Sequence, residues 1–574
     1  MINKTLADIF NEIASMLSLD ERPTARFEVR AYQKAALTVG TMQEPVEDVY
    51  EKGGLKALME IPGVGKSIAG HIEEYIKTGR IKKYDELKRK YPIDMAGLTS
   101  ITGMGPKRAM LLYKKLGIKN IDDLKRALAR HEIRTLEGFS EKSEEIIAKG
   151  LAFKEIGKGR MLIQDALPVG EQIVKKLLES GLVEKVMIAG SARRMRETVG
   201  DLDILAISKQ SGKVMDFFAK LPEVAEIVAK GPTKSTVRLK IGITCDLRSL
   251  EPESFGAAVQ YFTGSKDHNI QTRTIAIKKG YKLNEYGLFD KRNKNVGGVE
   301  EESIYEKLGM QWMPPEMREA RGEVELALQH RIPKLVELKD IKGDLHSHTK
   351  ATDGDNTLEE MADAAIKLGY EYIANTDHTK SLYVTKGMND RQFEEHFRKI
   401  DKFNDSQDDI RVLKGAEIEI LKDGSLDLAD STLKKMECLV ASVHSNFKMP
   451  KAEMTKRVVK ALDSGFVHIL GHPTGGVIGV RPPYEIDLEE VAEAAERNNV
   501  ALEINCLQRF DLNDSNILLT SKYKVKYAID TDSHLAAQFS MMRYGVGTAR
   551  RGWLQKERVI NAMPLDKLIK HLKK

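Results

Sequence analysis

The spacing of apolar residues divides the chain into a helical first part and later parts that alternate strands with helices. Over residues 1–150, apolar positions such as Leu6, Ile9 and Ile13 recur at helical spacing, which predicts short helices joined by glycine-containing turns. Between 181 and 256, apolar runs such as VEKVMIAG and GDLDILAIS are separated by helix-like segments. This pattern predicts a mixed sheet flanked by helices.

Residues 257 to about 316 return to helix and turn, and the polar, proline-marked stretch after them indicates a linker. From about 341 the chain alternates strand-like and helix-like segments repeatedly, which predicts a barrel or a wound sheet. We therefore expect a multidomain α/β protein. Its expected divisions are 1–85 and 86–155 (both helical), 156–256 (mixed sheet), 257–316 (a small domain), 317–340 (linker) and 341–574 (barrel).

Composition narrows the class of protein only a little. The chain has 574 residues, too many for one hydrophobic core, and its formal net charge of +6 permits a nucleic-acid partner without requiring one. The three cysteines are scattered and form no CxxC pair, which argues against a disulfide framework or a cysteine zinc site. A secretory signal and a long apolar run are both lacking. We expect a cytoplasmic protein with no membrane partner.

Two loops in the helical part share one pattern. IPGVGKSIA (61–69) and ITGMGPKRA (101–109) each combine glycines with a basic residue and open a helix. Glycines allow a tight turn, and the free N–H groups of the following helix N-terminus can hold a phosphate without reading base sequence. Ordinary glycine turns are the alternative, but the repetition favours helix-hairpin-helix DNA binding. The expected DNA contacts are Gly63, Gly65, Lys66, Gly103, Gly105 and Lys107.

A carboxylate cluster is predicted in the mixed sheet. Asp201 and Asp203 are two residues apart in a predicted strand, so both side chains point to one face, and Asp246 lies on another predicted strand. Carboxylates on one face are costly unless cations neutralise them, and Mg²⁺ prefers carboxylate oxygens together with substrate phosphates. The alternative is a surface strand with solvated aspartates. The Gly190-Ser191 pair upstream favours nucleotidyl transfer by two metal ions.

Histidines gather in the last part of the chain. Nine of the 13 lie after residue 340. Several of them, with carboxylates, stand at the ends of apolar runs, where the rim of a barrel would bring them together. Imidazoles suit Zn²⁺, Mn²⁺ or iron, and a buried core histidine is the alternative for any single one. The set suffices for a trinuclear metal site bridged by Glu417. Such a site would hydrolyse a phosphoester. The candidate ligands are His346, His348, Asp353, His378, Glu417, His444, His472, Asp532 and His534.

With the block YFTGSKDHNIQTRTIAIKKGYKLNEYGLF (261–289), residues 1–316 resemble the family X DNA polymerases. The resemblance implies helix-hairpin-helix domains, a nucleotidyltransferase palm, a small thumb, and a polymerase that uses Mg²⁺ or Mn²⁺ with gapped or primed DNA and deoxynucleoside triphosphates. It makes Asp201, Asp203 and Asp246 the catalytic metal ligands. It places the nucleotide at Gly190, Ser191, Arg194, Gly200, Tyr261, Phe262, Gly264, Asn269 and Arg273.

One departure concerns a lyase activity of that family. The lysine that forms an imine with an abasic sugar is replaced here by His71, and Ser67 stands where the family often has a further lysine. Histidine has no primary amine, so we expect no strong lyase of this type.

Residues 336–574 resemble the polymerase and histidinol phosphatase (PHP) domain, whose fold is a distorted barrel of seven strands. The resemblance implies three Mn²⁺ or Zn²⁺ ions. The first would be held by His346, His348, Glu417 and Asp532, the second by Asp353, Glu417 and His444, and the third by His378, His472 and His534.

Fusion to a polymerase implies DNA as the substrate of this domain, in 3′–5′ exonuclease, 3′-end processing or abasic-site endonuclease reactions. We expect a base-excision-repair monomer associated with the nucleoid. The alternatives are a DNA-end-binding scaffold with a structural metal cluster, and a small-molecule phosphatase fused to a DNA-binding module.

Overall fold

The computed structural model describes residues 2–573 except positions 21, 23, 24, 43, 44, 62, 100, 102, 103, 142, 145, 146, 149, 150, 152–159, 383, 384, 480, 482 and 508. The chain forms two compact units, residues 1–159 and 160–574. No helix within the described residues is both long and apolar enough to cross a membrane.

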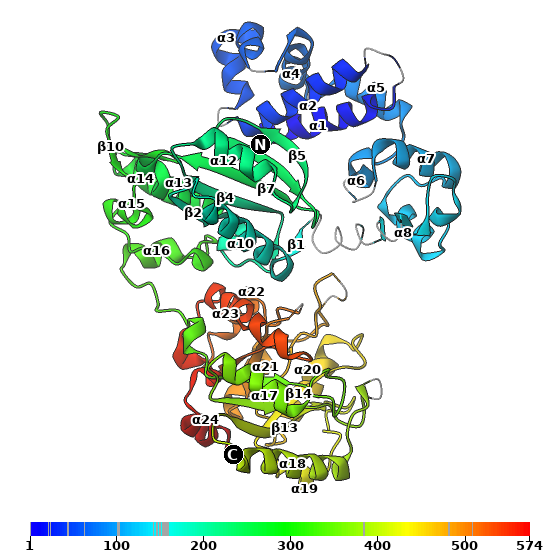
Figure 1. The fold of residues 1–574 in the computed structure, drawn as a ribbon, viewed down its shortest axis with the longest axis vertical. Helices are drawn as coiled ribbons and strands as arrows, with labels where there is room; N and C mark the ends of the chain where they lie inside the picture. The colour runs from blue at the N-terminus through cyan, green and yellow to red at the C-terminus, as the bar shows by residue number, and fades with distance from the viewer. Residues whose placement is uncertain are drawn as a thin grey trace. The chain divides into compact units, whose positions relative to one another are not determined.

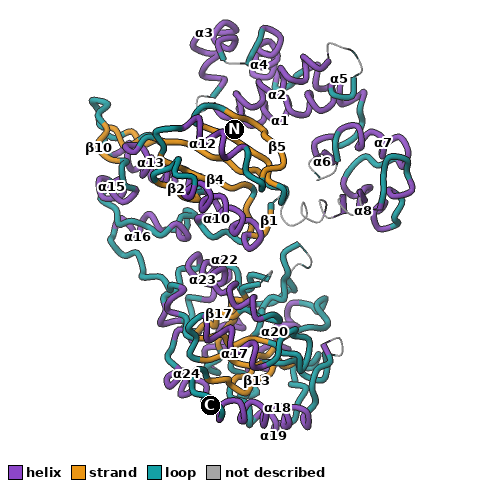
Figure 2. Tube along the Cα trace, viewed as in Figure 1, coloured by secondary structure: helices purple, strands orange, loops and turns teal. Residues whose placement is uncertain are grey.

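All the regular secondary structure described in the first unit is helical (Figures 1 and 2). Its amphipathic helices bury their apolar faces in two clusters. The first cluster is centred on Phe10 and Ile72, and the second on Leu98 and Leu112. The helices are α1 (Ile2–Leu17), α2 (Ala25–Thr41), α3 (Val46–Glu60), α4 (Lys66–Thr78), α5 (Lys82–Lys90), α6 (Met95–Thr99), α7 (Pro106–Leu116) and α8 (Ile121–Ala129).

The second unit begins with a five-stranded mixed sheet of strand order β2-β4-β7-β6-β5. Its central strands β4 and β7 are parallel, and the other pairs are antiparallel. Apolar residues alternate along β4 and β7 and are buried, so the polar positions between them share the other face. The elements are β1 (Met161–Leu162), α10 (Ile163–Glu179), β2 (Lys185–Ile188), α11 (Gly190–Arg193), β3 (Thr198–Val199), β4 (Asp201–Ile207), α12 (Ser211–Ala219), β5 (Val224–Lys230), β6 (Lys234–Leu239) and β7 (Thr244–Leu250).

A small domain with its own apolar cluster around Leu288 and Tyr305 follows the sheet. Its elements are α13 (Phe255–Thr263), α14 (Lys266–Lys278), the three-stranded sheet β8 (Lys282–Asn284), β9 (Gly287–Phe289) and β10 (Asn295–Gly297), and α15 (Glu301–Lys307).

The stretch expected as a linker, 317–340, is instead largely folded. It contains α16 (Glu323–Leu328), and the side chains of Arg318 and Glu323 are fully buried. Arg318 is held by the carboxylate of Glu301 at 2.5 Å, and Glu323 by the His268 imidazole at 2.8 Å. The partners of Arg318 and Glu323 lie outside this stretch of sequence. The polar composition of the stretch therefore suggested an exposed linker, because the groups that bury its charges could not be seen locally.

The last part is a barrel of seven parallel strands in sequential order, β11 to β17. A bridge between Ser347 and Ser533 brings the first strand to the last, so the sheet is nearly closed. Figure 2 shows the strands in the middle of this domain with helices around them. The expected α/β fold with a seven-stranded barrel is confirmed. The strands are β11 (Gly343–Ser347), β12 (Tyr372–Asn375), β13 (Arg411–Glu419), β14 (Cys438–Ser442), β15 (Ile469–Leu470), β16 (Ala501–Asn505) and β17 (Lys526–Asp530).

Helices connect and cover these strands. They are α17 (Leu358–Lys367), α18 (Asp390–Asp405), α19 (Asp430–Leu433), α20 (Lys451–Leu462), α21 (Leu488–Arg497), α22 (Asp514–Thr520), α23 (Met542–Arg551) and α24 (Leu565–Leu572).

Candidate active sites

The three aspartates of the mixed sheet lie on adjacent parallel strands. Asp201 begins β4, and Asp203 pairs in register with Asp246 of β7. Because residues two apart in a strand point the same way, and paired residues of neighbouring strands do too, all three carboxylates share one face. Their oxygens do not all come within 4.8 Å of one another, and Asp246 has other partners. Thr236 donates to it at 2.6 Å, and the Lys234 ammonium lies 2.8 Å away.

The electrostatics of this face favour a cation. Desolvation, together with the charges of Asp201 and Asp246, raises the pKa of Asp203 to about 7. The pKa of Asp201 is also raised, by desolvation and by Asp246. Crowded carboxylates of this kind become stable in their charged form when a divalent ion neutralises them. The donor set of carboxylate oxygens fits Mg²⁺ or Mn²⁺.

The glycine-serine pair sits directly over this face. Gly190 has a φ of 65°, and a Cβ there would lie 2.4 Å from Oδ2 of Asp203, so only glycine fits. The Ala189 N–H donates to the Asp203 carbonyl at 2.8 Å, which fixes the loop to β4. Ser191 follows Gly190 in the short helix α11.

The two arginines after Ser191 are both engaged within the protein. Arg193 donates two bonds of 2.9 Å to the Glu301 carboxylate, so its guanidinium is already paired with an acidic group. Arg194 donates from Nε to Glu319 at 3.0 Å and from Nη1 to the Thr263 carbonyl. Arg551 of α23 donates to the same Glu319 carboxylate at 2.9 Å. Glu319 therefore links Arg194 to the barrel domain.

The remaining nucleotide-site candidates gather around α13 and α14. The Tyr261 and Phe262 rings pack edge-on at 5.1 Å, and the Arg248 guanidinium covers the Phe262 ring at 4.4 Å. Asn269 donates to the Tyr261 carbonyl at 2.7 Å, and Arg273 donates to the Asn269 carbonyl at 3.3 Å.

Two glycines complete this set. Gly264 ends α13 against the Arg194 guanidinium, and Gly200 lies beside Arg160 at the start of β4. Sequence reasoning missed Lys234 and Arg248, which are register partners on β6 and β7; their alternation with buried residues was the available signal.

The two glycine loops of the first unit precede helices as expected. Gly65 caps α4 and Gly105 caps α7, so the N–H groups of each first turn point outward along the helix axis. Gly63 has a φ of 88° and packs against the Lys34 side chain. Lys66 and Lys107 are exposed in the first turns. Gly103 lies outside the described residues.

The nine candidate ligands of the barrel converge at the C-terminal ends of its strands. His346 and Glu417 lie near the ends of β11 and β13, while His444, His472 and Asp532 directly follow β14, β15 and β17. The ligand atoms form three groups, each within 4.8 Å. The groups are His346, His348, Glu417 and Asp532; His348, Asp353, His378 and His534; and Glu417, His444 and His472.

The first group has the same residues as the first expected set, and the other two groups combine the remaining candidates differently from the expected sets. Asp353 belongs with His378 and His534, because the loop after β11 folds back onto β17 through the Asp355 N–H and the His534 carbonyl at 2.8 Å. His472 belongs with His444, because β14 and β15 are neighbours in the barrel. The spacing of these residues along the chain did not indicate that Asp353 lies near His534 or that His472 lies near His444.

Glu417 connects two of the groups. Its Oε1 lies 3.2 Å from His444 Nε2 and 3.0 Å from His472 Nε2. Its Oε2 lies 3.4 Å from His346 Nε2 and 3.0 Å from His378 Nδ1. Ligand atoms around one ion are about 3.0–3.4 Å apart when each lies about 2.1 Å from it. The separations therefore suit ions that share the Glu417 carboxylate.

The buried nitrogens of the cluster support metal binding. Nε2 of His346 is buried without a hydrogen-bond donor or acceptor and faces Glu417 and Asp532, so a cation would give it the partner it lacks. Burial, with the nearby charge of His378, lowers the pKa of His348 to about 4, which keeps it neutral as a ligand. Asp532 and His472 have φ values of 54° and 27°, backbone strain typical of functional sites.

A second layer of acidic groups orients the histidines. His346 Nδ1 lies 2.6 Å from Glu503, and His444 Nδ1 lies 2.9 Å from Glu419. Such partners fix the ring and raise its basicity. The sequence analysis did not single out either glutamate. Glu419 stands two residues after Glu417 on the same strand face, and Glu503 stands in the apolar run ALEIN; both were signals that could have been used.

Comparisons with known proteins show which families the parts of this chain resemble. Family models match residues 1–81 (helix-hairpin-helix domain), 95–152 (SAM-like helix-hairpin-helix tandem), 258–319 (DNA polymerase beta thumb) and 344–506 (PHP domain). The DNA polymerase/3′-5′ exonuclease PolX of Bacillus subtilis (strain 168) is 35% identical over 557 residues, 96% of this chain and 95% of the relative.

Two further relatives match one part each. A probable phosphatase of Thermoanaerobacter sp. (strain X514) is 27% identical over 40% of this chain and 94% of its own length. DNA polymerase lambda of Arabidopsis thaliana is 23% identical over 55% of this chain and 62% of its own length. The chain belongs to the family X DNA polymerases that carry helix-hairpin-helix domains, a thumb and a C-terminal PHP domain.

Proposed function

We propose that the protein fills short gaps in DNA by template-directed nucleotidyl transfer and trims DNA 3′ ends with its PHP domain. The first part rests on the parallel pairing that sets Asp203 beside Asp246. Asp201 lies two residues before Asp203 on the same face of the sheet. The three metal-ligand groups at the barrel rim carry the second. The PolX relative, named for the same two activities, supports their combination in one chain. We also propose that the protein acts at the nucleoid, where its DNA substrate lies, and that it acts as a monomer.

In the polymerase site, Asp201, Asp203 and Asp246 would hold two Mg²⁺ or Mn²⁺ ions. These ions supply activation of the attacking hydroxyl and stabilisation of the leaving pyrophosphate. Gly190 brings the backbone close to the carboxylates, and Ser191 donates to a phosphate oxygen there. The Lys234 ammonium lies 2.8 Å from the Asp246 carboxylate in this structure. A bound ion would replace this contact of the Asp246 carboxylate with Lys234. Tyr261 and Phe262 pack against the sugar, and Asn269 and Arg273 lie toward the base pair.

Among the proposed nucleotide contacts, Arg194 would have to change its hydrogen-bond partners most. Its guanidinium is 12% exposed and bonded to Glu319 in this structure. A triphosphate would compete with Glu319 for it, because a phosphate offers the same charge-assisted geometry as a carboxylate.

In the PHP site, the three ligand groups would hold three Mn²⁺ or Zn²⁺ ions, and Glu417 belongs to two of these groups. Such ions lower the pKa of a bound water and clamp phosphate oxygens, which is the chemistry of phosphoester hydrolysis. Glu503 and Glu419 hold the rings of His346 and His444 in the orientation that ligation needs.

The test is primer extension on a short-gapped duplex, with and without nucleotides, in Mg²⁺ and in Mn²⁺. Asp203→Ala should abolish extension and keep primer degradation, and His346→Ala should do the reverse. Asp216→Ala, an exposed aspartate on α12, and His330→Ala, an exposed histidine outside both sites, are the matched controls. Extension by Asp203→Ala would refute the polymerase site, and degradation by His346→Ala would refute the nuclease site.

A second candidate for the PHP domain is a phosphomonoesterase, which the similarity to a probable phosphatase favours. It would release phosphate from small esters with the same ions. The test measures phosphate release from histidinol phosphate and nucleotide release from a DNA 3′ end, each with the wild type and with His346→Ala. The faster reaction that depends on His346 identifies the substrate class of the PHP domain.

A further inference from the structure

Helix α23 of the PHP domain binds the polymerase half of the second unit through arginines. Three pairs of side chains make this contact: Arg543 with Glu171 at 3.0 Å, Arg550 with Glu316 at 2.7 Å, and Arg551 with Glu319 at 2.9 Å. The third pair differs from the other two, because Glu319 also binds Arg194, a residue of the proposed nucleotide site. The contact between the two enzymatic parts therefore reaches a residue that would bind the triphosphate.

The carboxylate of Glu319 is shared by three guanidiniums. Arg194 and Arg551 both donate to its Oε1, at 3.0 and 2.9 Å, and Arg196 lies 3.5 Å from its Oε2. Since one oxygen serves both Arg194 and Arg551, the two cations repel each other and compete for its lone pairs. Burial lowers the pKa of Arg194, and the nearby charge of Arg551 lowers it further. Arg551 therefore weakens the hold of Glu319 on Arg194.

Arg551 is anchored independently of the Arg194 side chain. It is fully buried, and its Nη2 donates to the Asp514 carboxylate within the PHP domain. Its Nη1 also donates to the backbone carbonyl of Arg194 at 3.0 Å. The following residue, Met195, packs on α23 so closely that a Cβ at Gly547 would lie 2.7 Å from its Cε. Helix α23 thus holds the Arg194 backbone in place without holding its side chain.

We propose that Arg551 is a positioning residue for nucleotide incorporation: it competes with Arg194 for Glu319, so that the Arg194 guanidinium is available to the triphosphate of an incoming nucleotide. The inference rests on the proposed polymerase and on its Arg194 contact. When a triphosphate takes Arg194, Glu319 keeps Arg551 as its partner, so no buried carboxylate is left uncompensated. Without Arg551, the same step would leave Glu319 with only the more exposed Arg196. The PHP domain would in this way raise nucleotide affinity without touching the nucleotide.

Single-turnover gap filling by the full-length protein separates the Kd of the nucleotide from the maximal rate of incorporation. A phosphorothioate linkage at the primer end keeps the primer from being shortened during the assay. Arg551→Met keeps most of the side-chain stem and removes the charge, and Asp514 retains Arg321 as a partner at 3.1 Å. We expect the Kd to rise about 10-fold, as for the loss of one hydrogen bond between charged groups, and the maximal rate to stay within about twofold.

A second substitution distinguishes positioning from damage to the fold. In the double variant Arg551→Met/Glu319→Gln, the carboxylate that competes for Arg194 is also removed, so the Kd should return to within about twofold of the wild-type value. Damage to the fold would instead accumulate, because the second substitution removes a further buried charge. Circular dichroism shows whether each variant is folded before its Kd is measured.

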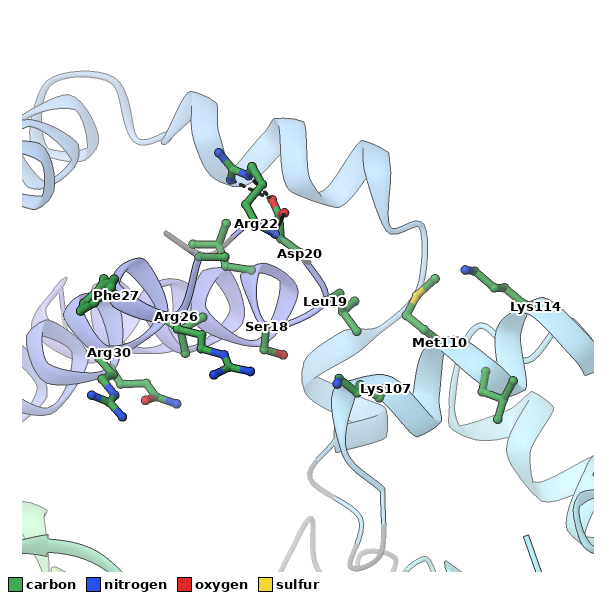
Figure 3. Close-up of a pocket in the computed structure, with 15 residues that line it drawn as sticks. Ser18, Leu19, Asp20, Arg22, Arg26, Phe27, Arg30, Lys107, Met110 and Lys114 are labelled. Atoms are coloured by element: carbon green, nitrogen blue, oxygen red, sulfur yellow. Dashed lines mark hydrogen bonds and ion pairs between the residues drawn. The ribbon is translucent and has the colours of Figure 1, made fainter. Parts of the chain in front are cut away.

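Arg22→Met is the matched control. It breaks an exposed arginine–aspartate pair at 2.8 Å beside the pocket of the first unit that Figure 3 shows, and it should leave the Kd of the nucleotide unchanged. An unchanged Kd in Arg551→Met would overturn the proposal, and so would a Kd that stays raised in the double variant. Either result would leave the proposed polymerase standing, because the wild type incorporates nucleotides in the same assay. A wild type that incorporates none would refute the proposed polymerase, and this inference with it.

Discussion

Replacing Glu319 by glutamine should destabilise the second unit strongly, because this carboxylate balances two buried guanidiniums. Its side chain is 10% exposed and accepts from Arg194 at 3.0 Å and from Arg551 at 2.9 Å. Arg551 is fully buried in α23. Glutamine keeps the size of the side chain and removes only its charge. Arg551 keeps its contact with the Asp514 carboxylate in this variant, whereas the Arg194 guanidinium loses its carboxylate partner. Removing one partner of a buried ion pair costs about 3–5 kcal/mol, since the remaining charge, here that of Arg194, is left uncompensated.

The pKa of Glu319 gives the same magnitude. Burial alone would raise the pKa, but Arg194 and Arg551 outweigh burial and lower the pKa to about 2. A fall from an ordinary value of 4.5 corresponds to about 3 kcal/mol of stability. Because the folded-state pKa is depressed, this stability is present above pH 4.5 and is lost as the pH falls toward 2. The difference between wild type and Glu319→Gln should therefore be about 1 kcal/mol smaller at pH 3.5 than at pH 7.

Urea unfolding followed by tryptophan fluorescence measures this effect. The two tryptophans of the chain, Trp312 and Trp553, both lie near the network: Trp312 donates to Glu301, and Trp553 lies beside Gly322. Asp463→Asn, which breaks the exposed pair with Arg497, is the control and should cost less than about 1 kcal/mol. Equal losses for Asp463→Asn and Glu319→Gln, or a Glu319 effect independent of pH, would refute the reasoning.

Three further predictions concern the sites themselves. Gly190→Ala should lower nucleotide incorporation about 100-fold or more while primer degradation persists, because the added Cβ would lie 2.4 Å from the Asp203 carboxylate. Gly212→Ala is the control in the same assay, because the space around Gly212 is open. Glu503→Gln should weaken Mn²⁺ binding about 10- to 100-fold in titrations followed by electron paramagnetic resonance, since it orients His346; unchanged affinity would show that the ring needs no such partner. Borohydride trapping on a 5′-deoxyribose-phosphate end should give little covalent adduct, because His71 lacks a primary amine, and a strong adduct would contradict this.

Motifs with fixed spacing along one or two elements were predictable from the sequence. The Asp201-Asp203 pair follows from the period of a strand, and the glycine loops before α4 and α7 follow from local backbone demands. The ligand residues of the barrel were found because each stands at the end of an apolar run, and parallel strands bring those ends to one rim. In these cases a local rule and the final structure agree.

Contacts between residues distant in sequence were decided only by the tertiary structure. The chain order did not reveal that Asp353 would lie with His534, that Lys234 would neutralise Asp246, or that Arg318 and Glu323 would be buried in a supposed linker. The sequence determined which chemical groups are present and which local elements carry them. The packing of those elements decided which groups meet, because burial and Coulomb energies depend on distances that local periodicity does not set.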